Sequence, residues 1–253
     1  MDREEQMLLR HFQDLSRAAW QRNRYSFTDF LNLNELSLLQ DHARELSGEI
    51  DLFGGRETCE RQVAAFLPER IYQEEKIPYP ISCIHIIQPG ARFAASSLTH
   101  RDYLGAILGL GVDRSKIGDI IVEDQEAYFF CISNIASFLL EELTQIGRQT
   151  VRCEEVDPTA VLGEVKQEEV SGTVSSCRLD AIIGVAFRTS RSQTQQLIEA
   201  GKVYVNARQI LSSHYLPAEG DVISVRGYGK FQYEGSYGQS KKGRMQIRIS
   251  KYI

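Results

Sequence analysis

In the first part of the chain, apolar side chains recur at helical spacing among charged residues. The pattern predicts helices over residues 1–24, 34–46 and 57–66, and a short strand and turn over residues 50–55. Gly48 follows the second helical pattern and is a suitable left-handed cap for its end. These elements together predict a small N-terminal α+β unit over residues 1–75.

A clearer order of elements follows. The pattern predicts strands over residues 81–87, 117–122, 127–132 and 150–156, and helices over residues 99–109 and 133–147. Thr99 and Asp102 stand at the spacing of a capping box, and Ser133 is placed to cap the second helix. The order βαββαβ is that of the ferredoxin-like fold, which RNA-recognition-motif domains share. We assign this domain to residues 76–157.

The next segment, residues 158–176, is rich in Gly, Ser, Thr and Glu. It is predicted to be a linker, although residues 161–174 keep some strand character and could pack on the neighbouring domain.

Two short helices and several strands are predicted for the final domain, residues 177–253. Ser190 is placed to cap the second helix, and Gly201 stands just past its end. The segment 235–244 is predicted to be a basic loop before a last strand. The fold class is therefore α+β throughout.

Charge divides the chain in two. From Arg178 onward there are 12 Lys and Arg against 5 Asp and Glu, a net charge of +7. Residues 1–177 hold 17 basic and 29 acidic side chains, a net charge of -12. A basic C-terminal domain is expected of a protein that binds a polyanion, whereas phosphates would repel the acidic remainder unless it is locally basic.

Other features of the composition narrow the class of protein. The 253 residues suffice for two or three domains, and no apolar run is long enough to span a membrane. The charged N-terminus does not resemble a signal peptide, so we expect a cytoplasmic location. The five cysteines are widely scattered, which favours reduced, buried thiols over a metal or redox site.

Four pieces of the C-terminal domain stand in a distinctive order and spacing: Arg178-Leu179-Asp180, the turn Arg188-Thr189-Ser190-Arg191, the segment 197–206 and the segment 219–227. Together they resemble the RNA-binding domain named after small-subunit ribosomal protein S-four. That domain occurs in several translation proteins, including tyrosyl-tRNA synthetases and rRNA-modifying enzymes.

The positions of these residues suit RNA binding. A helix N-terminus presents N–H groups and a positive dipole to phosphate, and the second helix is expected to begin within the basic turn. Polar residues in the turns of the following sheet could reach backbone oxygens and 2′-hydroxyls of folded RNA. The candidate RNA-binding residues are Arg178, Asp180, Arg188, Thr189, Ser190, Arg191, Gln195, Lys202, Asn206, Arg208, Arg226 and Lys230. Arg178 and Asp180 could instead pair with each other or cap the first helix.

Four segments extend the resemblance over the front of the chain: 53–55, 60–61, 98–111 and 116–120. They are similar to the bacterial YlmH family. The resemblance implies a front unit, a middle domain like an RNA-recognition motif and the S-four-type domain. It also implies a link to cell-division gene neighbourhoods and, by kinship with ribosome-quality-control proteins, to the large subunit and tRNA.

Two further features have competing interpretations. His100 and Arg101 begin a predicted helix and could make a second RNA contact, but helix capping explains Thr99 and Asp102. Tyr128 and Phe130 would share one face of a strand on which RNA-recognition motifs display stacking aromatics. Core packing is favoured for them, because the usual RNA-recognition signature is missing.

Three functions remain open. The preferred one is non-catalytic binding of structured RNA (rRNA, tRNA) on the ribosome or its large subunit, with no cofactor or metal, because no catalytic constellation is recognisable. The second is an RNA-modifying enzyme or its accessory. The third is a cell-division-linked adaptor that binds a protein partner through its acidic front domains.

Overall fold

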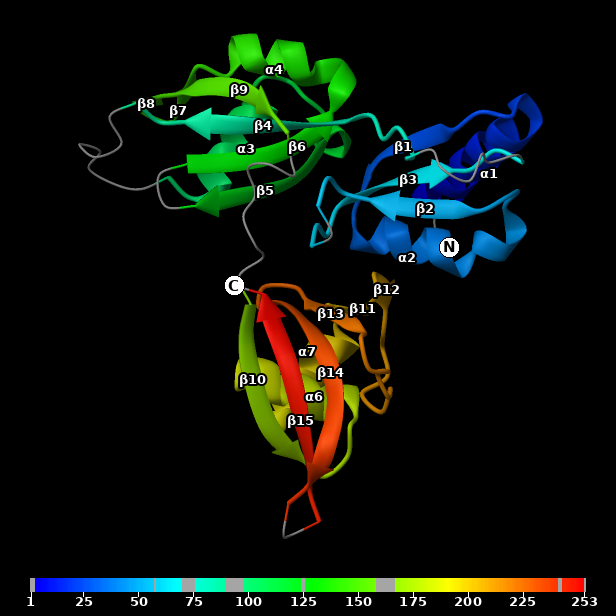
Figure 1. The fold of residues 1–253 in the computed structure, drawn as a ribbon, viewed down its shortest axis with the longest axis vertical. Helices are drawn as coiled ribbons and strands as arrows, with labels where there is room; N and C mark the ends of the chain where they lie inside the picture. Colours follow the sequence, from blue (N-terminus) through cyan, green and yellow to red (C-terminus); the bar gives the residue numbers. More distant parts are fainter. Residues whose placement is uncertain are drawn as a thin grey trace. The chain divides into compact units, whose positions relative to one another are not determined.

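A computed structural model describes residues 3–56, 58–69, 76–89, 98–123, 126–157, 167–240 and 243–252. The chain divides into two compact units, Met1–Gly163 and Glu164–Ile253 (Figure 1). Both units combine helices with antiparallel sheets, which confirms the α+β fold class.

The first unit begins with a three-stranded sheet in the order β1-β3-β2. Its elements are α1 (Arg3–Arg22), β1 (Ser26–Leu31), α2 (Leu33–Asp41), the 3-10 turn η1 (Ala43–Glu45), β2 (Ile50–Phe53) and β3 (Gln62–Phe66). The amphipathic helix predicted at the start of the chain is confirmed, because Leu9, Phe12 and Ala19 of α1 are buried while the charged residues are exposed.

The helix predicted over residues 57–66 is wrong. Residues 62–66 form β3, the central strand of this sheet, and the other described residues of that stretch contain no helix. Val63, Ala64, Ala65 and Phe66 are all fully buried. A short strand that is apolar on both faces lacks the alternation that would distinguish it from a buried helix. Strand β1 is unpredicted for a related reason, since its burial does not alternate strictly.

The rest of this unit has the predicted βαββαβ order. Its main elements are β4 (Ile81–Ile87), α3 (His100–Gly109), β5 (Ile117–Glu123), β6 (Glu126–Ile132), α4 (Ala136–Glu142) and β9 (Arg152–Val156). The 3-10 turns η3 (Arg114–Lys116) and η4 (Ser133–Ile135) precede β5 and α4. The strands form an antiparallel sheet in the order β5-β6-β4-β9, which is the ferredoxin-like arrangement.

The helix predicted over residues 133–147 is too long. Helix α4 ends at Glu142, and a two-stranded hairpin follows, made of β7 (Gln145–Ile146) and β8 (Gln149–Thr150). Gly147, with a φ of 58°, is therefore in the hairpin turn rather than at a helix end. Leu143 and Ile146 are buried as the helical pattern suggests, but the chain between them is not helical.

The two faces of the ferredoxin-like sheet have different neighbours. Helices α3 and α4 cover one face, where Phe129 packs with Tyr103, Ile107 and Leu139. Tyr128 and Phe130 point to the opposite face. They are 6% and 0% exposed and belong to a core that also contains Phe30 and Val63 of the first sheet. Core packing of Tyr128 and Phe130, the favoured interpretation, is confirmed.

Two glycines allow this close packing of the two sheets. A Cβ on Gly55 would lie 2.2 Å from Phe130 Cδ1, and a Cβ on Gly118 would lie 2.7 Å from Phe30 Cε1. Gly55 also has a φ of 96°, which side chains other than glycine rarely adopt.

Arg61 and Asp119 join the same two sheets by hydrogen bonds. The Arg61 guanidinium donates to the backbone oxygens of Phe30 (2.7 Å) and Ile117 (2.9 Å). Asp119 accepts from the backbone N–H groups of Glu60 (2.6 Å) and Arg61 (3.0 Å). Burial lowers the pKa of Arg61, while the charges of Glu35 and Asp119 raise it. Segments 53–55, 60–61 and 116–120, which carry the YlmH resemblance, thus meet in one place.

The second unit is built on a six-stranded antiparallel sheet in the order β10-β15-β14-β13-β11-β12. Its elements are β10 (Gln167–Val174), α6 (Leu179–Phe187), α7 (Arg191–Glu199), β11 (Val203–Val205), β12 (Arg208–Gln209), β13 (Val222–Val225), β14 (Gly229–Gln239) and β15 (Met245–Tyr252). Helices α6 and α7 lie on one face of the sheet, behind β10, β15 and β14 in Figure 1. Ile182, Ile198, Phe231 and Ile247 share their core.

Two predicted boundaries in this half of the chain need correction. Residues 167–174, assigned to the linker, form β10, which pairs along its whole length with β15. Residues 235–239, assigned to the basic loop, continue β14. Both strands carry exposed polar side chains, so neither forms the apolar run that predicts a strand. The burial of residues in β10 does alternate.

The five cysteines are free thiols, as predicted. Cys59, Cys83 and Cys131 are buried, whereas Cys153 and Cys177 are only half-buried. Burial raises the pKa of Cys83 and of Cys131 to about 12. Among the described residues, no helix is both long and apolar enough to cross a membrane.

The packing of the two sheets can be tested at Gly118. We expect Gly118→Ala to lower the free energy of unfolding of the first unit by about 1–3 kcal/mol, because its Cβ would overlap the Phe30 ring. Urea unfolding followed by the fluorescence of Trp20, the single tryptophan, measures this unit selectively. Gly105→Ala in α3 is the control, since its Cβ would meet nothing within 4 Å. An unchanged midpoint for Gly118→Ala would contradict the close packing.

Candidate nucleic-acid interface

The connection between α6 and α7 is only three residues long, from Arg188 to Ser190. Arg188 ends α6 with a φ of 53°, a left-handed conformation that costs a residue with a side chain about 1–2 kcal/mol. The sharp turn places Arg188 and Arg191 at the meeting point of the two helices, and both side chains are exposed. Thr189 between them is half-buried and its hydroxyl lies 2.9 Å from that of Thr194.

Ser190 caps α7, as predicted. Its hydroxyl accepts a hydrogen bond from the backbone N–H of Gln193 (3.3 Å), and its own backbone N–H donates to Gln193 Oε1 (3.0 Å). This capping box uses two of the N–H groups that the predicted phosphate cradle would have offered. Contact with phosphate must therefore depend more on side chains around the helix start than on these two groups.

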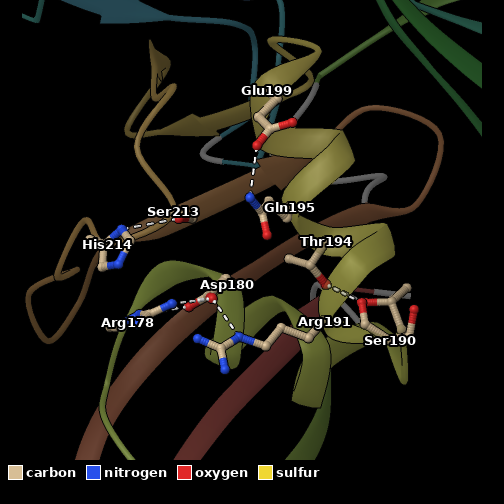
Figure 2. A network of polar contacts seen from close by, with 10 residues as sticks. Arg178, Asp180, Ser190, Arg191, Thr194, Gln195, Glu199, Ser213 and His214 are labelled. Atoms are coloured by element: carbon tan, nitrogen blue, oxygen red, sulfur yellow. Dashed lines mark hydrogen bonds and ion pairs between the residues drawn. The ribbon is translucent and has the colours of Figure 1, made fainter.

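Asp180 holds the arginines of this region in place (Figure 2). Its carboxylate accepts from Arg178 Nε (3.1 Å) and from the Arg178 terminal nitrogen, in a bidentate pair. Arg191 Nε lies 3.5 Å from the same carboxylate. The side chain of Asp180 is 4% exposed, that of Arg178 is 23% exposed and that of Arg191 is 76% exposed. Asp180 is therefore a positioning residue, and the pairing that was one of the open alternatives is confirmed.

An open pocket of about 370 Å³ lies beside this pair. Its polar lining includes Thr173, Arg178, Asp180, Thr189, Arg191 and Arg244. Arg244 donates a hydrogen bond to the backbone oxygen of Thr173 (3.2 Å), although the two residues are far apart in the sequence. Three guanidinium groups and one buried carboxylate line this pocket, which leaves an excess of positive charge that suits a phosphate or another anion.

A second open pocket has a volume of about 480 Å³ and is lined in part by the end of α6. Arg188 and Lys251 supply positive charge there, Glu168 supplies one negative charge, and Phe187 and Tyr228 supply aromatic surface. Lys251 Nζ is 5.5 Å from the centre of the Phe187 ring, and the rings of Phe187 and Tyr228 are 5.7 Å apart. Along β10, Gly172 stands between the residues that line the two pockets, and a Cβ there would overlap the Val185 side chain of α6.

The remaining candidate residues of this unit are spread over its turns. Gln195 bonds to Glu199 along α7 (2.9 Å), and Lys202 and Arg208 are exposed. Arg226 stacks over the Tyr204 ring at 5.2 Å, and Lys230 lies 5.8 Å from the centre of the Tyr252 ring. These side chains do not line either pocket.

Asn206 has a structural task. Its side chain donates to Asp221 Oδ1 (2.8 Å) and accepts from the backbone N–H of Val222 (2.9 Å). It stands with Ala207 in a two-residue turn, and both have positive φ values, as a type I′ hairpin requires.

His100 and Arg101 lie in the first unit, exposed at the start of α3. The carboxylate of Asp102 accepts hydrogen bonds from the hydroxyl (2.6 Å) and the backbone N–H (2.8 Å) of Thr99. These bonds to Thr99 lower the pKa of Asp102, so a negative charge occupies this helix start. That charge disfavours a phosphate contact, and the preceding residues 90–97 lie outside the described part of the chain.

Several residues that line the pockets were not among the candidates, including Arg244, Lys251, Phe187 and Tyr228. Arg244 belongs to the basic segment 235–244, whose charge is visible in the sequence. Nothing in the sequence indicates that this segment returns to the start of α6, because that follows from the pairing of β10 with β15.

Comparison with known proteins gives two matching family models. One, described as the putative RNA-binding domain in YlmH, matches residues 75–160, and the other, the S4 domain, matches residues 177–223. A curated relative, the ribosome-associated protein quality control protein P2 of Bacillus subtilis (strain 168), is 31% identical over 238 residues, which cover 93% of this chain and 90% of the relative. A solved structure of the cell division protein ylmH from Streptococcus pneumoniae aligns with a TM-score of 0.49 and 22% identity, over 64% of this chain and 96% of that one.

The anchoring role of Asp180 can be tested with Asp180→Asn. The amide keeps the shape but leaves the half-buried Arg178 guanidinium without its ionic partner, so we expect a loss of about 2 kcal/mol in the stability of this unit. Hydrogen–deuterium exchange of peptides from α6 and α7 measures the loss locally. Glu199→Gln, on the exposed side of α7, is the matched control and should exchange as the wild type does. Equal protection in all three proteins would show that Asp180 anchors nothing.

Proposed function

This chain belongs to the YlmH family, and we propose that it binds structured RNA, rRNA or tRNA, without catalysis, through the α6–α7 side of its C-terminal unit while associated with a ribosomal particle. The observation that carries the proposal is the cluster of arginines near the buried carboxylate of Asp180, which binds Arg178 and lies close to Arg191. Arg178, Arg191 and Arg244 line one open pocket, and Arg188 lines the next.

Fixed guanidinium groups suit phosphate better than mobile lysines. A guanidinium presents its N–H donors in a plane that matches two phosphate oxygens, and less freedom is lost on binding when the group is already held. Asp180 provides this hold for Arg178 on both of its oxygens. Since those oxygens already accept hydrogen bonds, the carboxylate serves as an anchor, which agrees with a binding role.

The distribution of charge supports the same assignment. The net charge of +7 from Arg178 onward attracts RNA, and the net charge of -12 over residues 1–177 repels it, so the basic unit would approach the RNA first. The middle domain matches a family model described as a putative RNA-binding domain. The part of its sheet face around Phe130 is covered by the first sheet, which leaves less of that face for RNA.

The ribosomal particle is proposed from the relative. The B. subtilis protein, which is named as ribosome-associated, aligns with nearly the whole of this chain. Both units of this chain therefore have counterparts in it, including the part that precedes the S4 domain. We propose that the acidic first unit orients the basic unit on the particle, through contacts with protein rather than with RNA.

Charge reversal at the turn between the helices tests the proposal. We expect Arg188→Glu with Arg191→Glu to abolish co-sedimentation of the full chain with purified large ribosomal subunits through a sucrose cushion. With the neutral pair Arg188→Gln and Arg191→Gln, the slope of log affinity against log salt should fall by about 2, one for each phosphate that the protein no longer neutralises. Retained co-sedimentation of the charge-reversed protein would refute this assignment.

The control for this experiment is the pair Arg10→Glu with Arg17→Glu in α1. Both residues are also exposed, and the pair changes the net charge by the same amount. It should leave co-sedimentation unchanged. An equal loss in the control would mean that only the total charge of the chain matters, and that the α6–α7 turn is not a binding site.

A further inference from the structure

We propose that the C-terminal sheet has a second RNA surface on the face opposite α6 and α7, and that this surface takes unpaired nucleotides. We call it the outer face and define it by Arg226, Lys230, Tyr237, Arg248 and Tyr252. These residues all lie beyond residue 223, where the match to the S4 domain ends. The proposal is independent of the phosphate site at the α6–α7 turn.

The register of the strands shows which side chains share the outer face. In β15, Ile247 and Ile249 are fully buried in the core that contains α6. Alternation along the strand therefore directs Arg248 and Tyr252 away from the helices. Figure 1 shows β10, β15 and β14 in front of α6 and α7, and no described helix of this unit lies on that front side.

A row of paired residues crosses the sheet on this face. Tyr204 of β11 pairs with Ser224 of β13, and Ser224 pairs with Lys230 of β14. The next pair, Phe231 with Lys251, places Lys230 opposite Tyr252 of β15. Paired residues of neighbouring strands point to the same face, so the row from Tyr204 to Tyr252 spans three strand spacings, about 14 Å.

Each tyrosine of this face has a cationic side chain over its ring. Arg248 lies 5.2 Å from the centre of the Tyr237 ring, Lys230 lies 5.8 Å from that of Tyr252, and Arg226 lies 5.2 Å from that of Tyr204. Tyr204 is fully buried, so its ring supports the exposed guanidinium of Arg226. Tyr237 is 55% exposed and offers its own ring to solvent.

This arrangement fits the chemistry of unpaired RNA. Bases that are not in a duplex stack on tyrosine rings and on guanidinium planes, while positive charges beside them attract the phosphates. Glu169 lies 3.4 Å from Arg248 and steadies its guanidinium. Arg248 and Tyr252 are four residues apart in β15, about 13 Å, so the face is long enough for more than one base. The bases of a duplex are stacked inside it, so a duplex could interact only with the positive charges of this face.

The test is the affinity of the full chain for a fluorescein-labelled, 12-nucleotide U-rich RNA, followed by fluorescence anisotropy. We expect Tyr237→Ala and Arg248→Ala each to weaken binding at least about fivefold, the lower end of the effect of one stacked base. Tyr237→Trp, which keeps an aromatic ring, should bind at least as well as the wild type. Phe138→Ala in α4 is the control, because Phe138 is also an exposed aromatic residue, at 44%.

A blunt-ended duplex RNA, which has no unpaired nucleotides, separates the two proposed surfaces. Its affinity should be unaffected by Tyr237→Ala and reduced by Arg188→Glu with Arg191→Glu. Single-strand binding that is the same in the wild type, Tyr237→Ala and Arg248→Ala would overturn the outer-face proposal, including the case in which this face binds a protein. So would an equal loss with Phe138→Ala, or full competition by a duplex of the same length.

Discussion

The packing of Phe130 against the first sheet determines what the front of this chain can do. In a ferredoxin-like domain with one face covered by helices, the other face of the sheet is the surface available for RNA bases. Here Phe130 of that face is fully buried, and the backbone of Gly55 lies against its ring. Arg61 then joins the two sheets with hydrogen bonds to Phe30 and Ile117. That part of the surface is used for folding and is not available to bind RNA bases.

The C-terminal unit differs from the front of the chain, because it buries one charge, that of Asp180, beside arginines that stay accessible to solvent. A carboxylate as buried as Asp180 costs free energy to remove from water, and one ion pair often does no more than offset that cost. Stability alone is therefore a poor reason for this residue. Its effect is to fix Arg178 and to attract Arg191 at the turn where two helices meet. Such positioning has value for a binding site, where the guanidinium groups must already be in place.

The sequence predicts those parts of the fold in which local chemistry decides the structure. The cap at Ser190, the helix start at Thr99 and the βαββαβ order all follow from side chains within a few residues of one another. The sequence does not predict elements that depend on contacts between residues far apart in the chain. Strand β3 is buried on both faces because Phe66 packs against Phe12 of α1 and Val63 lies in the core that contains Phe130, and β10 is a strand because β15 pairs with it. The place of Arg244 beside Arg178 depends on that same pairing.

The outer face is a candidate site that the sequence pattern indicates only in part. From Met245 to Tyr252 the residues alternate between buried Ile247 and Ile249 and the polar or aromatic Arg248, Ser250 and Tyr252. A period of two assigns the second set to one face, but only the cross-strand register brings Lys230 and Tyr204 to it. The sequence predicts a loop over residues 235–239. A loop there would not pair with β15, so the prediction does not place Tyr237 on this face. Because the helices occupy the other face, the same alternation that builds the core also gathers the cations and tyrosines together.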